Sequence, residues 1–83
     1  MVNVTIQFFG VLAERAGKQT LEIQVPTDWS DAAGMIRECV DEHIGDAPYS
    51  VLINGRALQL ALATKVTMNE GDLIAIVPIV SGG

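Results

Sequence analysis

Residues 2–8 (VNVTIQF) alternate between apolar and polar side chains. A period of two over this length is typical of a β-strand with one buried face. Phe9 follows on the polar side of the alternation, which favours an exposed ring. Residues 10–17 predict a short helical turn closed by Gly17, and the alternation returns in residues 21–25 (LEIQV) until Pro26. The first third of the chain therefore predicts two strands joined by a long loop.

The next apolar positions are spaced as on a helix. The stripe consists of Ala32, Ala33, Ile36, Val40 and Ile44. Thr27, Asp28 and Ser30 are all suitable N-caps, and Gly45 begins the terminating segment, so we predict a helix over residues 29–44. Gly34 lowers helix propensity by up to about 1 kcal/mol, and we interpret it as a point of close packing against a sheet.

The second half of the chain predicts three more strands. A strand over 50–53 meets Asn54-Gly55, a two-residue hairpin signal, and pairs with a short strand over 56–59. The turn at residues 69–72 (NEGD) precedes a strand over 73–77 that is apolar at every position, which predicts that both of its faces are covered. The expected fold class is α+β, a mixed sheet packed against one main helix. A β-grasp places the last strand centrally beside the first.

Composition narrows the functional classes. The chain has 83 residues, enough for one domain, and its residues are 49% hydrophobic but only 18% charged. The apolar excess fits either an exposed partner patch or a well-filled core. A net charge of −5 argues against nucleic-acid binding, and a single cysteine excludes an internal disulfide. The N-terminus has neither a signal-peptide pattern nor a spanning segment, so we expect a cytoplasmic protein without a membrane role.

Few side chains suggest chemistry inside the domain. Glu38, Asp41 and Glu42 form a carboxylate cluster that we interpret as a solvated helix face, and we expect no metal site. His43 suits the negative end of the helix. Cys39 lies beside the apolar stripe, as expected of a small buried hydrophobe, and Trp29 is interpreted as a staple or a lid.

The last six residues (PIVSGG) offer a different kind of chemistry. Residues 80–83 contain little that can pack, so we expect residues 78–83 to form a flexible tail that follows a domain over 1–77. Glycine has no Cβ, so Gly82-Gly83 fits a narrow tunnel that excludes side chains. The terminal carboxylate then becomes the reactive group inside another protein's active site.

Three segments resemble the MoaD/ThiS sulfur-carrier family, and its molybdopterin synthase branch most closely. They are IQFFGVLAERAG at 6–17, VLINGRAL at 51–58 and NEGDLIAIVPIVSGG at 69–83. The last is the most specific, because turn, strand, Pro78 and diglycine stand in fixed register. The chain departs from the family pattern at Ala13, where arginine is common, at Gly34, and at Ile79, which replaces a second proline.

The resemblance implies a protein cosubstrate rather than a complete enzyme. A ubiquitin-activating-type (MoeB-like) adenylating enzyme uses ATP to activate Gly83, which becomes a thiocarboxylate, and the chain itself binds no cofactor. The tail then enters a larger (MoaE-like) synthase subunit, in a hetero-oligomer, and donates sulfur to a pterin precursor. The expected partner surface consists of Phe9, Arg56, Leu58, Leu60, Pro78, Ile79, Val80 and Ser81, although Leu58 and Leu60 could equally close the core.

Other outcomes stay open at this point. The same chemistry could serve thiamine, cysteine or transfer-RNA thiolation. A ubiquitin-like modifier would instead join Gly83 to lysines of other proteins, and a binding module would carry an idle tail.

Overall fold

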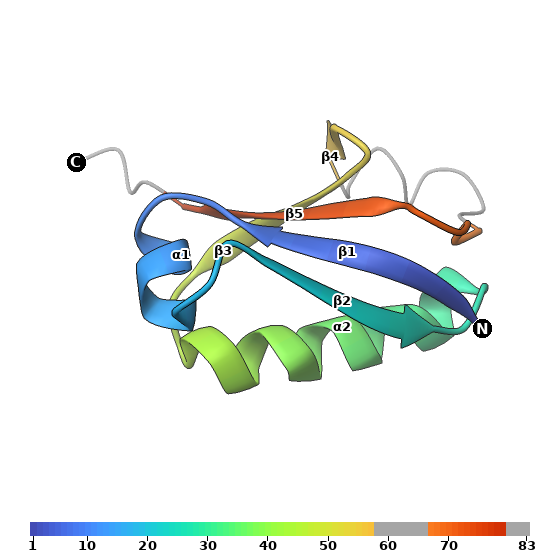
Figure 1. The fold of residues 1–83 in the computed structure, drawn as a ribbon, viewed down its shortest axis with the longest axis horizontal. Helices are drawn as coiled ribbons and strands as arrows, with labels where there is room; N and C mark the ends of the chain where they lie inside the picture. The colour runs from blue at the N-terminus through green and yellow to red at the C-terminus, as the bar shows by residue number, and fades with distance from the viewer. Residues whose placement is uncertain (58–66, 80–83) are drawn as a thin grey trace.

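The computed structural model describes residues 1–57 and 67–79. The elements in chain order are β1 (Val2–Phe8), α1 (Val11–Ala16), β2 (Thr20–Val25), α2 (Trp29–Ile44), β3 (Tyr49–Ile53), β4 (Arg56–Ala57) and β5 (Leu73–Pro78). Helix α2 lies across one face of the sheet, and α1 lies at the end of the sheet where β5 finishes (Figure 1).

The sheet has the order β2-β1-β5-β3-β4. β1 is antiparallel to β2 and parallel to β5, while β3 is antiparallel to both β5 and β4. The first and last strands are therefore central neighbours. This mixed sheet grasping one long helix confirms the predicted β-grasp.

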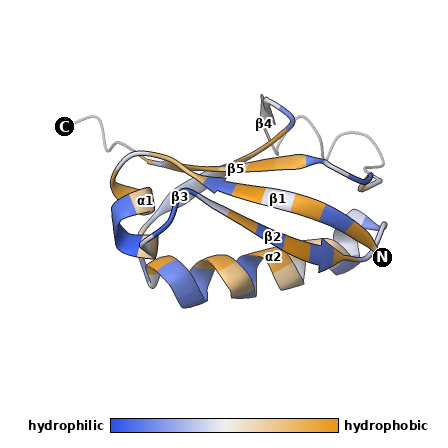
Figure 2. Ribbon diagram, viewed as in Figure 1, coloured by the Kyte–Doolittle hydropathy of each residue, from blue (hydrophilic) through white to orange (hydrophobic). Residues whose placement is uncertain are grey.

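The core lies between the sheet and α2. Alternate side chains of β1 are buried there, and the α2 stripe meets them, as the apolar inner positions of Figure 2 show. The helix has its predicted bounds: Asp28 is the N-cap, and its Oδ1 accepts from the Ser30 amide at 3.1 Å. At the Asn54-Gly55 turn both residues have positive φ (51° and 83°), as the hairpin signal predicts.

Three details differ from expectation. Gly34 does not mark close packing, because a Cβ built there has nothing within 4 Å. β5 is covered on both faces only in part: Ala75 is 7% exposed, but Leu73 is 37% exposed. β5 also continues to Pro78, one residue past the strand predicted over residues 73–77. The division into a domain and a tail stays a prediction, because residues 80–83 lie outside the described residues.

Candidate functional site

Three exposed apolar side chains surround the point where β5 ends. Phe9 is 40% exposed, Val11 is 55% exposed and Ile79 is 51% exposed. The Phe9 amide donates to the Ile76 carbonyl at 3.0 Å, and a Cβ built at Gly10 would lie 3.6 Å from Cγ of Pro78. We call Phe9, Val11, Pro78 and Ile79 the tail-root patch. The sequence indicated all of them except Val11, whose exposure depends on how α1 is oriented.

A second set of apolar side chains lies on the face of the sheet opposite α2. Ile74 and Ile76 are buried in the core, so the alternation of a strand turns Leu73, Ala75 and Val77 to the other face. Leu52 is paired with Ala75 on this face. We call Leu52, Leu73, Ala75 and Val77 the outer strip. In the sequence this set is marked by the unbroken run of apolar residues 73–77, from which we predicted that both faces of the strand are covered.

The structure separates some of the predicted partner residues. Arg56 is paired with Ile53 in β4, the outermost strand, so β5 and β3 lie between its backbone and β1. Leu58, Leu60, Val80, Ser81, Gly82 and Gly83 lie outside the described residues, and their roles stay predictions. Phe9, Pro78 and Ile79 are the predicted residues that the fold brings together.

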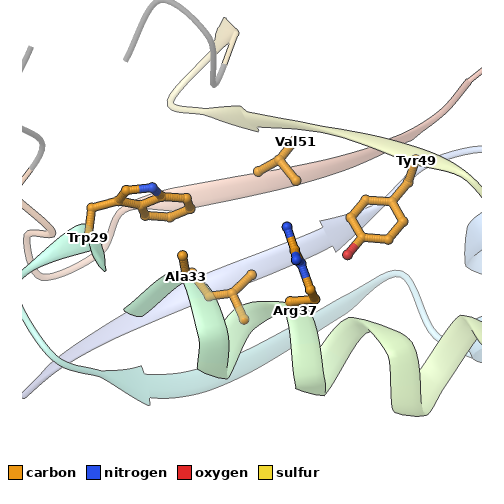
Figure 3. Close-up of a pocket in the computed structure, with 6 residues that line it drawn as sticks. Trp29, Ala33, Arg37, Tyr49 and Val51 are labelled. Atoms are coloured by element: carbon orange, nitrogen blue, oxygen red, sulfur yellow. The ribbon is translucent and has the colours of Figure 1, made fainter. Parts of the chain in front are cut away.

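A pocket of about 330 Å³ opens between α2 and β3. Trp29, Ile36 and Arg37 line it from the helix, and Tyr49 and Val51 line it from the strand (Figure 3). The half-buried Trp29 forms one wall, in keeping with its interpretation as a lid. Burial raises the pKa of Tyr49, with a further contribution from the Asp41 charge, while Arg37 opposes both effects. Tyr49 is also the strand partner of Pro78, so this end of the pocket adjoins the tail root.

The family comparison reaches the end of the chain. The family model of ThiS matches residues 6–83, which include the end of β1, all of β5, the tail root and the terminal diglycine. The chain belongs to the ThiS family. It is thus a ubiquitin-like sulfur carrier, as the resemblance of its segments implied. Comparison with curated proteins finds no match.

Solved structures of similar fold include two modifier proteins and a complex of molybdopterin-converting factor subunits. The ThiS-family chain resembles the small archaeal modifier protein 1 of Methanosarcina acetivorans with a TM-score of 0.69 at 21% identity, covering 100% of this chain and 98% of that one. The protein of the same name from Haloferax volcanii has a TM-score of 0.60 at 29% identity, and the match covers 98% of this chain and 99% of that one. The complex of subunits 1 and 2 of the molybdopterin-converting factor from Helicobacter pylori has a TM-score of 0.60 at 20% identity, and the match covers 99% of this chain and 100% of that one.

Cys39 and His43, the other side chains considered for chemistry in this ThiS-family domain, have structural roles. Burial, followed by the Glu42 charge, raises the pKa of Cys39, so its thiolate is disfavoured at neutral pH. Nδ1 of His43 lies 2.8 Å from the Cys39 carbonyl oxygen, and its ring lies 6.0 Å from that of Phe8. Within residues 1–57 and 67–79, no group of acidic, His or Cys side chains could hold a metal ion. Helices of the described part are too short or too polar to cross a membrane.

Proposed function

We propose that this sulfur carrier is the small, sulfur-donating subunit of a molybdopterin synthase-type complex, with Gly83 as the site that is adenylated and converted to a thiocarboxylate. The observation that carries the proposal is the ThiS match, which extends through Gly82-Gly83 to the last residue. Support for this branch comes from the likeness of the fold to the subunit complex of the Helicobacter pylori molybdopterin-converting factor.

The chemistry begins at the terminal carboxylate. A carboxylate oxygen of Gly83 attacks the α-phosphate of ATP in the adenylating enzyme, and pyrophosphate leaves. A persulfide sulfur then attacks the acyl carbon and displaces AMP. A second thiol reduces the resulting acyl disulfide, which leaves the thiocarboxylate on Gly83 and a disulfide between the two thiols. The carrier contributes the acyl group, and its partners contribute ATP binding and the sulfur.

Two partners follow from this chemistry. One is a ubiquitin-activating-type adenylating enzyme, and the other is a larger synthase subunit that binds the pterin precursor. The tail-root patch supplies exposed apolar side chains beside the tail, those of Phe9, Val11 and Ile79, and buried apolar area is the main source of binding energy in such interfaces. We propose a cytoplasmic location for this reaction, because its activation step consumes ATP.

A second candidate function is protein modification through Gly83. It is favoured by the likeness to small archaeal modifier proteins, including one at 29% identity over nearly the whole chain. In that case a lysine amine, rather than a persulfide, attacks the activated acyl carbon. The first steps are shared, so only the final acceptor separates the two functions. Thiamine, cysteine or transfer-RNA thiolation would likewise differ only in the acceptor of the sulfur.

Intact mass spectrometry tests the proposal directly. The full chain is incubated with an adenylating enzyme, ATP and a persulfide donor, and we expect a mass increase equal to the difference between one sulfur and one oxygen atom. The loaded carrier should then convert the cyclic pterin precursor to a dithiolene in the presence of the large synthase subunit. A variant that lacks Gly82-Gly83 should keep its circular dichroism spectrum and lose both reactions.

Mass spectrometry of the carrier and of cellular proteins, together with the truncated variant, distinguishes the alternative functions. Glycine remnants on lysines of cellular proteins, without any sulfur-for-oxygen exchange in the carrier, would favour the modifier and contradict the sulfur donor. A loaded carrier that transfers no sulfur to the pterin would keep the carrier role and reject the molybdopterin branch. Full biological activity of the truncated variant would reject every function that uses Gly83.

A further inference from the structure

Strand β5 is held on both sides up to its last residues. On the β1 side the register ends with Phe8 opposite Ile76, and the next amide, that of Phe9, donates to the Ile76 carbonyl at 3.0 Å. On the β3 side the last pair joins Tyr49 to Pro78. The backbone is therefore fixed by two neighbouring strands just before the tail begins.

Pro78 also lies close to the turn that precedes α1. A Cβ built at Gly10 would lie 3.6 Å from Cγ of Pro78, so the proline ring borders the space that a side chain at position 10 would occupy. Gly10 has φ 56° and ψ −133°, a conformation that glycine adopts without steric cost. Figure 1 shows this turn and α1 at the end of the sheet where β5 finishes.

The chain passes from a strand paired on both sides to an exposed segment between Pro78 and Ile79. Pro78 is half-buried and belongs to β5, whereas Ile79 is 51% exposed and lies outside the strand. The pyrrolidine ring also fixes φ of Pro78 near −65°, so this residue has little rotational freedom of its own. The direction in which the chain leaves the sheet is set at this point.

We propose that Pro78, paired with Tyr49 at the end of β5 and next to the Gly10 turn, is a positioning residue that fixes the point from which the tail reaches into the partner's catalytic centre. This inference rests on the proposed function, because it matters only if the Gly83 carboxylate reacts inside a partner. The five residues from Ile79 to Gly83 span at most about 17 Å when extended. With a fixed origin, this short reach limits the region that the carboxylate can visit, which lowers the entropic cost of a productive encounter.

The first test replaces Pro78 by alanine and measures thiocarboxylate formation with the adenylating enzyme, ATP and a persulfide donor. Pro78→Ala removes the pyrrolidine ring and with it the φ restraint. We expect kcat to fall about two- to fivefold, the size expected for one released backbone restraint, and because Pro78 belongs to the tail-root patch its effect on docking is read separately, from KM. Pro26→Ala is the matched control, since Pro26 follows the end of β2 that pairs with the start of β1.

A second test separates aiming from general stability. One glycine inserted between Ile79 and Val80 should lower kcat in the wild-type background and have less effect when combined with Pro78→Ala, because the unaimed tail already explores many directions. Simple additivity would mean that Pro78 and the tail act independently. A measurement without any partner completes the set: the backbone order parameter of Ile79 should be lower in Pro78→Ala than in the wild type.

The outcomes distinguish the two levels of the argument. Wild-type protein that gains no sulfur would overturn the proposed function and this inference with it. Wild-type protein that loads normally, together with a Pro78→Ala variant of unchanged kcat and unchanged Ile79 order parameter, would overturn the positioning role alone. A loss explained entirely by a raised KM, or matched by Pro26→Ala, would also overturn it.

Discussion

Asn54 joins two distant parts of the fold with one side chain. Its Oδ1 accepts from the Leu73 amide at 2.9 Å, and its Nδ2 donates to Oδ1 of Asp72 at 3.0 Å. The other oxygen of the buried Asp72 accepts from the Asn69 amide at 2.7 Å. The sequence predicted the turn at Asn54, because the Asn-Gly signal is local. It could not predict the link to β5, because residues 54 and 72 become neighbours only after the strands pair.

Glu70 gives the fold a predictable dependence on pH. Its carboxylate oxygens accept from N and Nδ2 of Asn3 at 3.0 and 2.9 Å, and these bonds hold the pKa of Glu70 below its ordinary value of 4.5. A pKa depressed by folding contributes stability that is present above the unfolded-state pKa and is lost as pH falls through the folded-state value. Wild type should therefore be more stable than Glu70→Gln at neutral pH, and the difference should vanish in strong acid.

Chemical denaturation of both proteins across this range measures the difference in the free energy of unfolding. Glu22→Gln serves as the control, because it removes the same charge from an exposed position on β2. A difference between wild type and Glu70→Gln that stayed constant into strong acid would contradict the assignment.

Helix α2 shows why some elements are predictable to the residue. An N-cap, an apolar stripe and a terminal glycine coincide in residues 28–45, and each is a local signal. The last turn of α2 also makes a contact that cannot be predicted from the local sequence. Nε of Arg15, from α1, donates to the Ile44 carbonyl at 3.1 Å. The prediction that Gly34 packs closely against the sheet was wrong for the same reason, because it depends on tertiary contacts. Whether a glycine faces a sheet or solvent depends on tertiary contacts rather than on its position in a helix.

Gly34→Ala should stabilise the protein. A Cβ at this helical position meets nothing within 4 Å, so alanine lowers the entropy of the unfolded chain without a clash. We expect a gain of about 0.5 to 1 kcal/mol in the free energy of unfolding, measured by denaturation at neutral pH. Gly71→Ala is the contrasting variant: it also has open space, but its φ of 84° disfavours alanine, so stability should fall. Equal losses in both variants would contradict the open environment of Gly34.

At the scale of the whole molecule, the strand order decides which predicted residues can act together. The fold class and the central place of β5 followed from strand count and from the apolarity of the last strand. The partner surface followed only in part, because the register sets which side chains share a face. It places Phe9 beside the end of β5 and Arg56 in an edge strand, and neither result can be predicted before the strands are paired.

If the tail-root patch binds the partner, a charge placed in this patch should weaken partner binding more than a charge placed elsewhere on the surface. Phe9→Asp should weaken binding of the large synthase subunit about tenfold or more, because it places a charge in the apolar contact. Met35→Asp is the matched control: Met35 is 41% exposed, against 40% for Phe9, but lies on α2 instead. Calorimetry gives the dissociation constants, and melting temperatures verify folding. Equal losses in both variants, or none in Phe9→Asp, would argue against this surface.

The pairing of β5 with β1 and β3 also has a mechanical consequence. Tension applied at the carboxyl end of β5 is directed along the middle of the sheet. Such a load is shared among the transverse bonds to both neighbouring strands and does not open them one after another. A domain built in this way resists unfolding when it is pulled by its carboxyl end.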